Sequence, residues 1–372
     1  MAERLTMLAA LLAGASLTLV GLSAIPVTKW TWTQLGTVGS PPGPVNPILL
    51  YDSREDRTFL FSGAMWVLDF ANRTWTSLHT TRGPPPWYLA SGVYDSRADR
   101  IFVFGGLVYG QPLSDTWSFD PDNATWTNLT LRAGPGPRYA AAAAYDAGLD
   151  RVVLYGGYGY APSPYGTFQV YTDTWLFDPE SGVWTNVTAT STPPPLGVVR
   201  LFYDPQGRQD ILIGRGNEYD TWSFNGTALR WTNVTPAYSP GPGYVDLSST
   251  YDSLDAEVII VARASSLEAA DHMVTWGYRP STNSWSMLPT LSVPTEYMNA
   301  GLTFDVHENH SILFGGGSVL APSNETWILG EPLAVSTTAV NPYVFPIVVG
   351  GCIAVVALAL YVWKHRAKLR PR

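Results

Sequence analysis

The sequence predicts an all-β protein built as a six-bladed β-propeller, and three features of its 372 residues support this fold. A Trp-Thr/Ser-x-apolar motif recurs six times, at intervals of 43 to 58 residues. Most units also contain a strand-forming apolar run, such as IFVFGG or VVLYGG, a few residues after an aromatic-Asp pair. Finally, 34 glycines and 30 prolines with only 14% charged residues are typical of short strands joined by tight turns. Six such units across residues 27–330 predict a closed ring of four-stranded blades.

Tryptophan marks two positions in the unit, and core packing is the simplest role for both. One series lies in the predicted fourth strand: Trp32, Trp75, Trp126, Trp184, Trp231 and Trp285. The other series begins the third strand, mostly as Asp/Glu-Thr-Trp: Trp66, Trp117, Trp175, Trp222, Trp276 and Trp327. The sixth unit ends after its third strand, so we expect the strand that carries Trp32 to complete it and to close the ring.

The first strand of each unit ends in Tyr-Asp, with Phe304-Asp305 as the sixth case. Acids such as Asp52, Asp95 and Asp146 are expected to cap their own turns through side-chain hydrogen bonds to the backbone.

These units resemble kelch repeats, which show a glycine pair after the second strand and a tryptophan further on. The glycine pairs here are Gly105-Gly106, Gly156-Gly157 and Gly315-Gly316. Units one, four and five depart from the pattern, with Ser62-Gly63, Gly214-Arg215-Gly216 and Ala262-Arg263 in its place. The resemblance implies a kelch-type propeller related to the central domain of galactose oxidase, a fold that serves both binding proteins and enzymes.

The resemblance does not extend to copper-radical chemistry. Galactose oxidase needs a cysteine cross-linked to a tyrosine, and the single cysteine here, Cys352, lies in an apolar C-terminal run. No cofactor is therefore expected. The net charge is −8 although six of the 22 Lys and Arg lie in the terminal segments, so the middle of the chain is acidic and nucleic acid is not an expected partner.

Both ends of the chain resemble targeting segments. Residues 1–25 are interpreted as a signal peptide or a retained signal anchor. Residues 344–363 contain no charge and are long enough for a transmembrane helix, and the basic tail 364–372 favours a cytoplasmic C-terminus. With 331–342 as a linker, the sequence predicts a single-pass cell-membrane protein whose propeller lies outside the cell.

Topology divides the loops between two faces. The loops between strands two and three and those between successive units (the 2–3 and 4–1 loops) share one face. Because the tether leaves from a third strand, this face should point away from the membrane. Its longest loop, GGYGYAPSPYGTFQVYTDTW, is rich in Tyr and Gly, as binding surfaces are.

The candidate ligand-binding residues lie in these loops or follow their proline-rich segments. They are Tyr109, Tyr158, Tyr160, Tyr165, Phe168, Tyr171, Tyr219, Trp87, Arg138 and Arg200. The alternative for the aromatic residues is that they fold their own loop onto the blade. For Trp87 and the two arginines, stacking between blades is the alternative.

Eight Asn-x-Ser/Thr sequons are candidate glycosylation sites, more than chance predicts from 13 asparagines. Their asparagines are Asn72, Asn123, Asn128, Asn186, Asn225, Asn233, Asn309 and Asn324. The alternative is that Trp-Thr-Asn-x-Thr is a structural motif of the fourth strand.

No metal site is expected, because His307 and His310 lie in a turn with no evident third ligand. The leading functional hypothesis is a non-catalytic recognition or adhesion module that binds a surface glycan or an extracellular protein through the 2–3/4–1 face. A sugar-active enzyme (isomerase, lyase or hydrolase) on the same face and a structural envelope protein are the alternatives. An acid-rich channel would favour the enzyme, and an aromatic rim poor in carboxylates would favour binding.

Overall fold

The computed structural model describes residues 30–330 apart from short gaps at 44–45, 81–82, 86–87, 131–132, 161–166, 217–218, 242–243, 265–271, 291–293, 295–298 and 319–320. The predicted signal segment 1–25, linker 331–342, transmembrane segment 344–363 and tail 364–372 lie outside the described residues. Among the residues that are described, no helix has the length and apolar character needed to cross a membrane.

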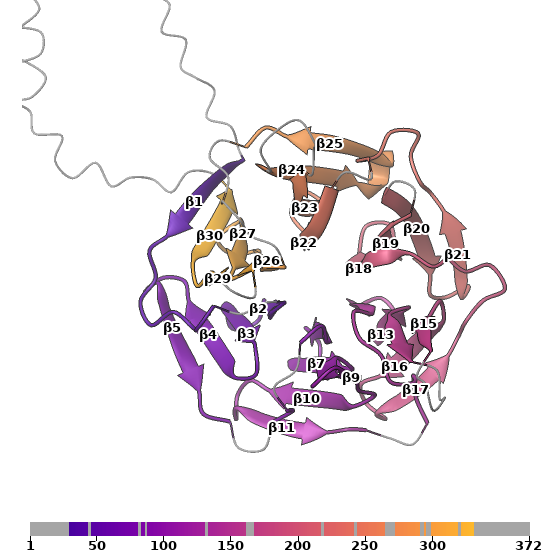
Figure 1. Ribbon diagram of the computed structural model, residues 1–372, viewed down its shortest axis with the longest axis horizontal. Coiled ribbons are helices and arrows are strands. Elements are labelled where there is room, and N and C mark those ends of the chain that lie inside the picture. The colour runs from indigo at the N-terminus through magenta and orange to yellow at the C-terminus, as the bar shows by residue number, and fades with distance from the viewer. Residues whose placement is uncertain are drawn as a thin grey trace, which may run out of the picture. The chain divides into compact units, whose positions relative to one another are not determined.

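Six antiparallel four-stranded sheets surround a central axis like the blades of a propeller (Figure 1), which confirms the predicted fold. Blade 1 consists of β2 (Ile48–Asp52), β3 (Arg57–Phe61), β4 (Met65–Asp69) and β5 (Thr74–Leu78). Blade 2 consists of β6 (Ser91–Asp95), β7 (Arg100–Phe104), β10 (Thr116–Asp120) and β11 (Thr125–Asn128). Blade 3 consists of β12 (Ala142–Asp146), β13 (Arg151–Tyr155), β16 (Thr174–Asp178) and β17 (Val183–Asn186).

The second half of the ring has the same strand order. Blade 4 consists of β18 (Gly197–Asp204), β19 (Gln209–Arg215), β20 (Tyr219–Asn225) and β21 (Arg230–Asn233). Blade 5 consists of β22 (Tyr244–Asp252), β23 (Glu257–Ala264), β24 (His272–Arg279) and β25 (Ser284–Leu288), with the short 3-10 helix η1 (Pro280–Thr282) before its last strand. Blade 6 consists of β26 (Gly301–Asp305), β27 (His310–Phe314), β30 (Thr326–Gly330) and β1 (Thr31–Leu35).

The ring closes as predicted, through the first described strand. β1 lies beside β30 and pairs with it in antiparallel orientation (Figure 1). Trp32 lies opposite Leu329 in this pair. The Trp32 side chain is only 1% exposed and packs in a core formed by blades 5 and 6. Sequence-distant ends of the ring are thus joined in one sheet, which removes the open edge that blade 6 would otherwise have.

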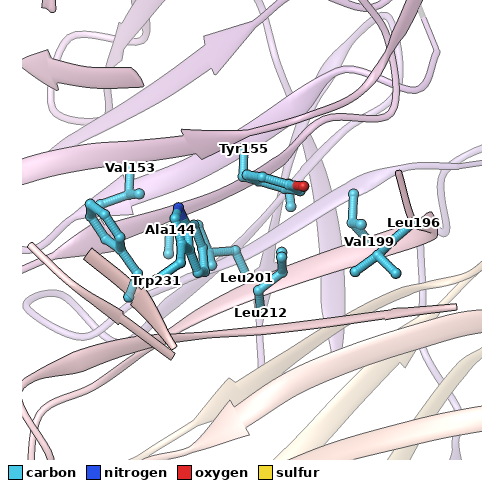
Figure 2. Close-up of a cluster of buried hydrophobic side chains, with 10 residues drawn as sticks. Ala144, Val153, Tyr155, Leu196, Val199, Leu201, Leu212 and Trp231 are labelled. Carbon is cyan, nitrogen blue, oxygen red and sulfur yellow. The ribbon is translucent and has the colours of Figure 1, made fainter. Parts of the chain in front are cut away.

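The two tryptophan series differ in burial. All six strand-four tryptophans are buried, at 1% to 8% exposure, whereas most of the strand-three series is half-buried. Figure 2 shows the core between blades 3 and 4, where Trp231 lies among Val153, Leu201 and Leu212. Apolar side chains from two facing sheets fill this space, and their burial is the main stabilising contribution to the fold.

A recurring hydrogen bond fastens neighbouring blades to one another. In four blades, the indole N–H of the strand-four tryptophan donates to the threonine that directly precedes the strand-three tryptophan of the preceding blade. Trp231 donates to Thr174 and Trp184 to Thr116, both at 2.9 Å. The same bond is made by Trp75 to Thr326 at 3.0 Å and by Trp32 to Thr275 at 3.1 Å. The threonine before the strand-three tryptophan is therefore an acceptor between blades.

The Tyr-Asp motif forms a second link between blades, and its acids cap turns as predicted. Asp95 Oδ1 accepts the backbone N–H groups of Arg97 and Ala98 at 2.9 and 3.0 Å, and Asp52 and Asp146 cap their turns in the same way. The hydroxyl of Tyr94 donates across the junction to Asp52 of blade 1. This sequence motif thus fixes both the turn and the packing of adjacent blades.

Blade 4 departs from this scheme at one buried position. The residue paired with the strand-one tyrosine is Ile101 in blade 2 and Val152 in blade 3, but it is Asp210 in blade 4. Asp210 is 0% exposed, and neither carboxylate oxygen has a hydrogen-bond partner within the described residues. Burial, and then the charge of Asp146, raise the pKa of Asp210 well above its usual value.

Candidate ligand-binding face

The face that carries the 2–3 loops is extended by three short hairpins. They are formed by β8 (Leu107–Val108) with β9 (Gln111–Pro112), by β14 (Tyr158–Tyr160) with β15 (Phe168–Val170), and by β28 (Gly317–Ser318) with β29 (Ala321–Pro322). They belong to blades 2, 3 and 6, respectively, so this face is irregular where the blade cores are repetitive.

The hairpin of blade 2 presents a single aromatic side chain at its tip. Tyr109 and Gly110 have φ angles of 49° and 76°, the left-handed pair that a tight two-residue hairpin requires. Tyr109 is 96% exposed. A backbone geometry that few residues tolerate therefore holds a large side chain in solvent.

Main-chain hydrogen bonds tie two of these hairpins to the loop that enters the same blade. Tyr88 and Leu107 exchange N–H···O bonds of 2.9 and 3.3 Å, and Tyr139 and Tyr158 exchange two of 2.9 Å. The 2–3 and 4–1 loops therefore share one face, as topology predicts, and the bonds hold the aromatic residues in place.

In blade 3 the aromatic side chains form a stack with an exposed outer layer. The rings of Tyr139 and Tyr158 have centroids 5.7 Å apart, and Tyr158 stacks on Phe168 at 5.5 Å. Tyr158 is half-buried, whereas Tyr160 and Phe168 are 42% and 55% exposed. The inner rings fold the loop onto the blade, which was the alternative interpretation, while the outer rings face solvent, as a binding surface requires. Tyr165 lies outside the described residues.

Arg138 does not line a surface, contrary to the sequence prediction. It is 1% exposed, and its guanidinium donates two parallel hydrogen bonds of 2.6 and 2.9 Å to the Asp173 carboxylate. Its guanidinium carbon also lies 4.0 Å from the centre of the Tyr171 ring. Burial alone would raise the pKa of Asp173, but the hydrogen bonds and charge of Arg138 lower it on balance. Arg138 and the half-buried Tyr171 thus fasten the loop before blade 3 to that blade.

Two more candidates are placed differently from the prediction or lie beyond the description. Tyr219 is only 2% exposed and packs in the core between blades 4 and 5, because it begins the third strand of blade 4 rather than a loop. It is therefore not a rim residue. Trp87 lies outside the described residues.

Arg200 lines the central channel, a cavity of about 560 Å³ bounded by the innermost strands of all six blades. A β-bulge between Gly197 and Arg200 shifts the register of β18 at this point. Arg200 is the only charged residue among the described residues that line the channel. Burial lowers the pKa of its guanidinium, yet an arginine begins so high that it stays protonated. The part of the channel wall that the structure describes therefore carries no carboxylate.

Sequence reasoning missed two members of the aromatic set, Tyr88 and Tyr139. Both follow proline-rich segments, and Tyr88 is 45% exposed. The signal was present in the sequences PPPWYLA and GPRYAA, where the tyrosine is adjacent to the residue that was singled out.

The side chains of all eight sequon asparagines are exposed. The alternative structural reading is also supported for three of them, Asn128, Asn186 and Asn233. In each, the asparagine Oδ1 accepts the backbone N–H of the threonine two residues later, at 2.8 to 3.0 Å. That threonine hydroxyl accepts the backbone N–H of the threonine before the strand-three tryptophan, as Thr130 does from Thr116. The Trp-Thr-Asn-x-Thr motif therefore closes the end of the blade.

The two histidines of the last 1–2 turn have different surroundings. His310 is 7% exposed and stacks on Phe70 at 6.0 Å, so it is not a solvated turn residue as predicted. His307 is exposed, but it lies beside two carboxylates, Asp56 and Asp305, and these three side chains can together hold a metal ion. Sequence reasoning missed this set because its members come from opposite ends of the ring.

Residues 53–252, more than half of the chain, match the family model described as the KLHDC2/KLHL20/DRC7 Kelch-repeats domain. The chain is a kelch-repeat protein. Kelch propellers are scaffolds for protein–protein interaction, so the family assigns a general role and leaves the ligand open. No curated protein matches the chain.

Proposed function

We propose that this kelch propeller is a non-catalytic recognition module that binds an extracellular protein through the 2–3/4–1 face of blades 2 and 3. The observation that carries the proposal is a group of four exposed aromatic side chains on two anchored hairpins and their neighbouring loops. The group, called the aromatic rim below, consists of Tyr88, Tyr109, Tyr160 and Phe168.

The physical case rests on anchoring and on charge. Large amphipathic rings contribute more binding free energy at an interface than other side chains that lose the same conformational entropy on binding. Their contribution is greatest when the backbone that carries them is already fixed in the free protein. The main-chain bonds of Tyr88 and Tyr139 provide that fixation. The guanidinium of Arg138 is engaged by Asp173. Because this guanidinium is paired with a carboxylate within the blade, it is not offered to a ligand. The rim itself consists of aromatic rings and tyrosine hydroxyls, which suit apolar contact and hydrogen bonding.

We further propose that the propeller is displayed outside the cell by a single transmembrane helix at residues 344–363. The uncharged apolar run and the basic tail 364–372 support this arrangement. The described chain leaves blade 6 at Gly330, the end of a third strand, so the rim lies on the face away from that exit. Exposure of the sequon asparagines supports their glycosylation.

A labelling experiment tests the orientation. A membrane-impermeant amine-reactive biotin applied to intact cells is expected to label Lys29, the single lysine of residues 27–330, and to leave Lys364 and Lys368 unlabelled until the cells are permeabilised. Labelling of Lys368 on intact cells would reverse the proposed topology.

A binding experiment tests the rim. The purified full-length chain is screened against a cell-surface protein library and a glycan array, and each hit is titrated with Tyr109→Ala/Tyr160→Ala/Phe168→Ala. About 2 kcal/mol for each aromatic anchor would sum to more than a ten-thousandfold loss, and because such contributions are not additive, the triple variant should bind at least about a thousandfold more weakly. The matched control is Leu254→Ala/Val183→Ala, which removes side chains that are 52% and 45% exposed in or beside turns of the opposite face.

Each outcome decides a separate point. Equal affinity of the triple variant and the unchanged chain refutes the rim as the binding surface. Loss of binding in the control variant alone moves the site to the opposite face. Hits confined to the glycan array, with the same loss in the triple variant, keep the rim and replace the protein ligand by a glycan.

A further inference from the structure

The junction between blades 6 and 1 brings together three side chains that are distant in the sequence. Asp305 and His307 lie in the 1–2 turn of blade 6, and Asp56 lies in the corresponding turn of blade 1. One ligand atom from each lies within 4.8 Å of the others. His307 Nδ1 is 3.7 Å from Asp56 Oδ1, and the Tyr51 hydroxyl contacts both atoms.

These separations are close to those of a metal coordination shell. Two ligands at about 2.0 to 2.1 Å from a tetrahedral zinc ion lie about 3.4 Å apart. The His307–Asp56 distance of 3.7 Å needs only a small side-chain rotation to reach that value. Both side chains are about half-exposed, at 52% and 46%, which leaves an open path for an ion, and a bound ion would replace their contacts with the Tyr51 hydroxyl.

Asp305 supplies the fixed point of the group. It is 1% exposed, and its Oδ1 accepts the backbone N–H groups of His307 and Glu308 at 2.9 and 3.0 Å. These bonds hold the carboxylate in one orientation and place His307 beside it. One buried, oriented ligand and two adjustable ones are the arrangement that lets a site form around an ion with little rearrangement.

Comparison with the junction between blades 2 and 3 shows what is different about this one. There, Tyr145 contacts Asp150 at 2.7 Å, as Tyr51 contacts Asp56 at 2.8 Å. The position that corresponds to His307 is occupied by Arg97, which forms an ion pair with Asp150 at 2.7 Å.

A permanent cation thus balances the carboxylates between blades 2 and 3. Between blades 6 and 1, an imidazole, which can coordinate a metal ion through a ring nitrogen, takes the place of that guanidinium.

We propose that Asp56, Asp305 and His307 bind a divalent transition-metal ion, with Zn²⁺ as the best match, and that the ion links blade 6 to blade 1. One imidazole nitrogen and two carboxylate oxygens suit zinc, with water in the fourth position. Calcium prefers six to eight oxygen ligands and fits this set less well. The site lies on the face opposite the aromatic rim and is independent of the proposed ligand.

The test uses the full-length chain after treatment with a chelator. Zn²⁺ is added during isothermal titration calorimetry, and thermal unfolding is followed with and without the ion. One Zn²⁺ ion per chain and a higher Tm are expected, because an ion that binds only the folded state stabilises it. His307→Ala should weaken binding at least tenfold and remove the Tm shift.

Two variants separate this site from non-specific binding. Glu308→Gln changes an exposed acid on the same turn that is not part of the triad, and it should leave zinc binding unchanged. His307→Arg reproduces the residue found between blades 2 and 3, so it should raise the Tm without metal and abolish the response to Zn²⁺. Absence of a zinc-dependent Tm shift in the unchanged chain, or its persistence in His307→Ala, refutes the site.

Discussion

The junctions between blades and the 2–3 loops of this propeller follow opposite rules. At the junctions, the same contacts recur: an indole N–H on a threonine, and a tyrosine hydroxyl near the aspartate of the previous blade. The 2–3 loops have no common form, with hairpins on blades 2, 3 and 6. The repeated contacts at the junctions stabilise the ring. The 2–3 loops differ from blade to blade because their residues do not take part in the contacts that close the ring.

The largest expected effect comes from removing the residue that closes the ring. Trp32→Ala should destabilise the fold by about 3–5 kcal/mol, because a fully buried tryptophan leaves a cavity in the blade 6 core. Chemical denaturation measures the change. Tyr109→Ala, in the most exposed aromatic residue of the rim, should change stability by less than about 0.5 kcal/mol. Similar losses in both variants would erase the distinction between junctions and loops.

The hydrogen bond between blades can be tested with a pair of equivalent threonines. Thr174→Val should cost about 1–3 kcal/mol, because the Trp231 indole N–H loses its buried acceptor. Thr221 occupies the same position in blade 4, but neither its hydroxyl nor the indole of Trp285 has a hydrogen-bond partner within the described residues. Thr221→Val should therefore be nearly neutral. Equal effects in denaturant titrations would assign the cost to shape rather than to the hydrogen bond.

Asp210, at the junction between blades 3 and 4, is a second place where a substitution should increase stability. Asp210→Val restores the residue type found at Val152 and should stabilise the chain by about 1–3 kcal/mol at neutral pH, since it removes an unpartnered buried acid. Asp210→Asn is the isosteric comparison.

The benefit of Asp210→Val should depend on pH in a defined direction. Burial raises the folded-state pKa of Asp210, so the folded chain keeps a proton that the unfolded chain loses as the pH rises above about 4. The stability of the unchanged chain relative to the valine variant should then fall from acidic toward neutral pH, up to the folded-state pKa. A stability difference that stays constant with pH would show that Asp210 keeps the same charge in both states.

The smallest effect on stability, and the largest on recognition, is expected from the aromatic rim. Tyr160→Ala and Phe168→Ala remove partly exposed rings and should lower the Tm by no more than a few degrees. Circular dichroism melts measure this change. A large loss of stability would mean that the rings serve the packing of blade 3, and that the rim has been mistaken for a binding surface.

Sequence reasoning succeeded where one residue type serves one repeated environment. Trp32 could be assigned to the last blade because the tryptophan pattern has a vacant position there, and pairing with Leu329 confirms it. The capping role of Asp95 followed from local chemistry within a single turn.

The errors arose where a side chain's partner lies far along the chain. Arg138 follows a proline-rich loop, which suggested a surface position, but it is buried because its guanidinium pairs with the carboxylate of Asp173, 35 residues later. The contact of His307 with Tyr51 spans 256 positions and exists only because the ring closes. Tyr219 was placed on the rim because its strand begins earlier than the Asp-Thr-Trp motif suggests. The structure does not describe Trp87 or Tyr165, so their roles stay predictions.

The pairing of β1 with β30 also determines how the ring responds to mechanical force. Thr31 lies opposite Gly330, so the first and last described strands enter and leave the sheet at the same end. Tension that pulls these two ends apart loads one rung of the ladder at a time, and the bonds break in sequence, as in a zipper. Strands loaded from opposite ends would have to break all their bonds together, at a much higher force. The closing strand that stabilises the ring at rest is therefore also the place where a pull on the chain would open it first.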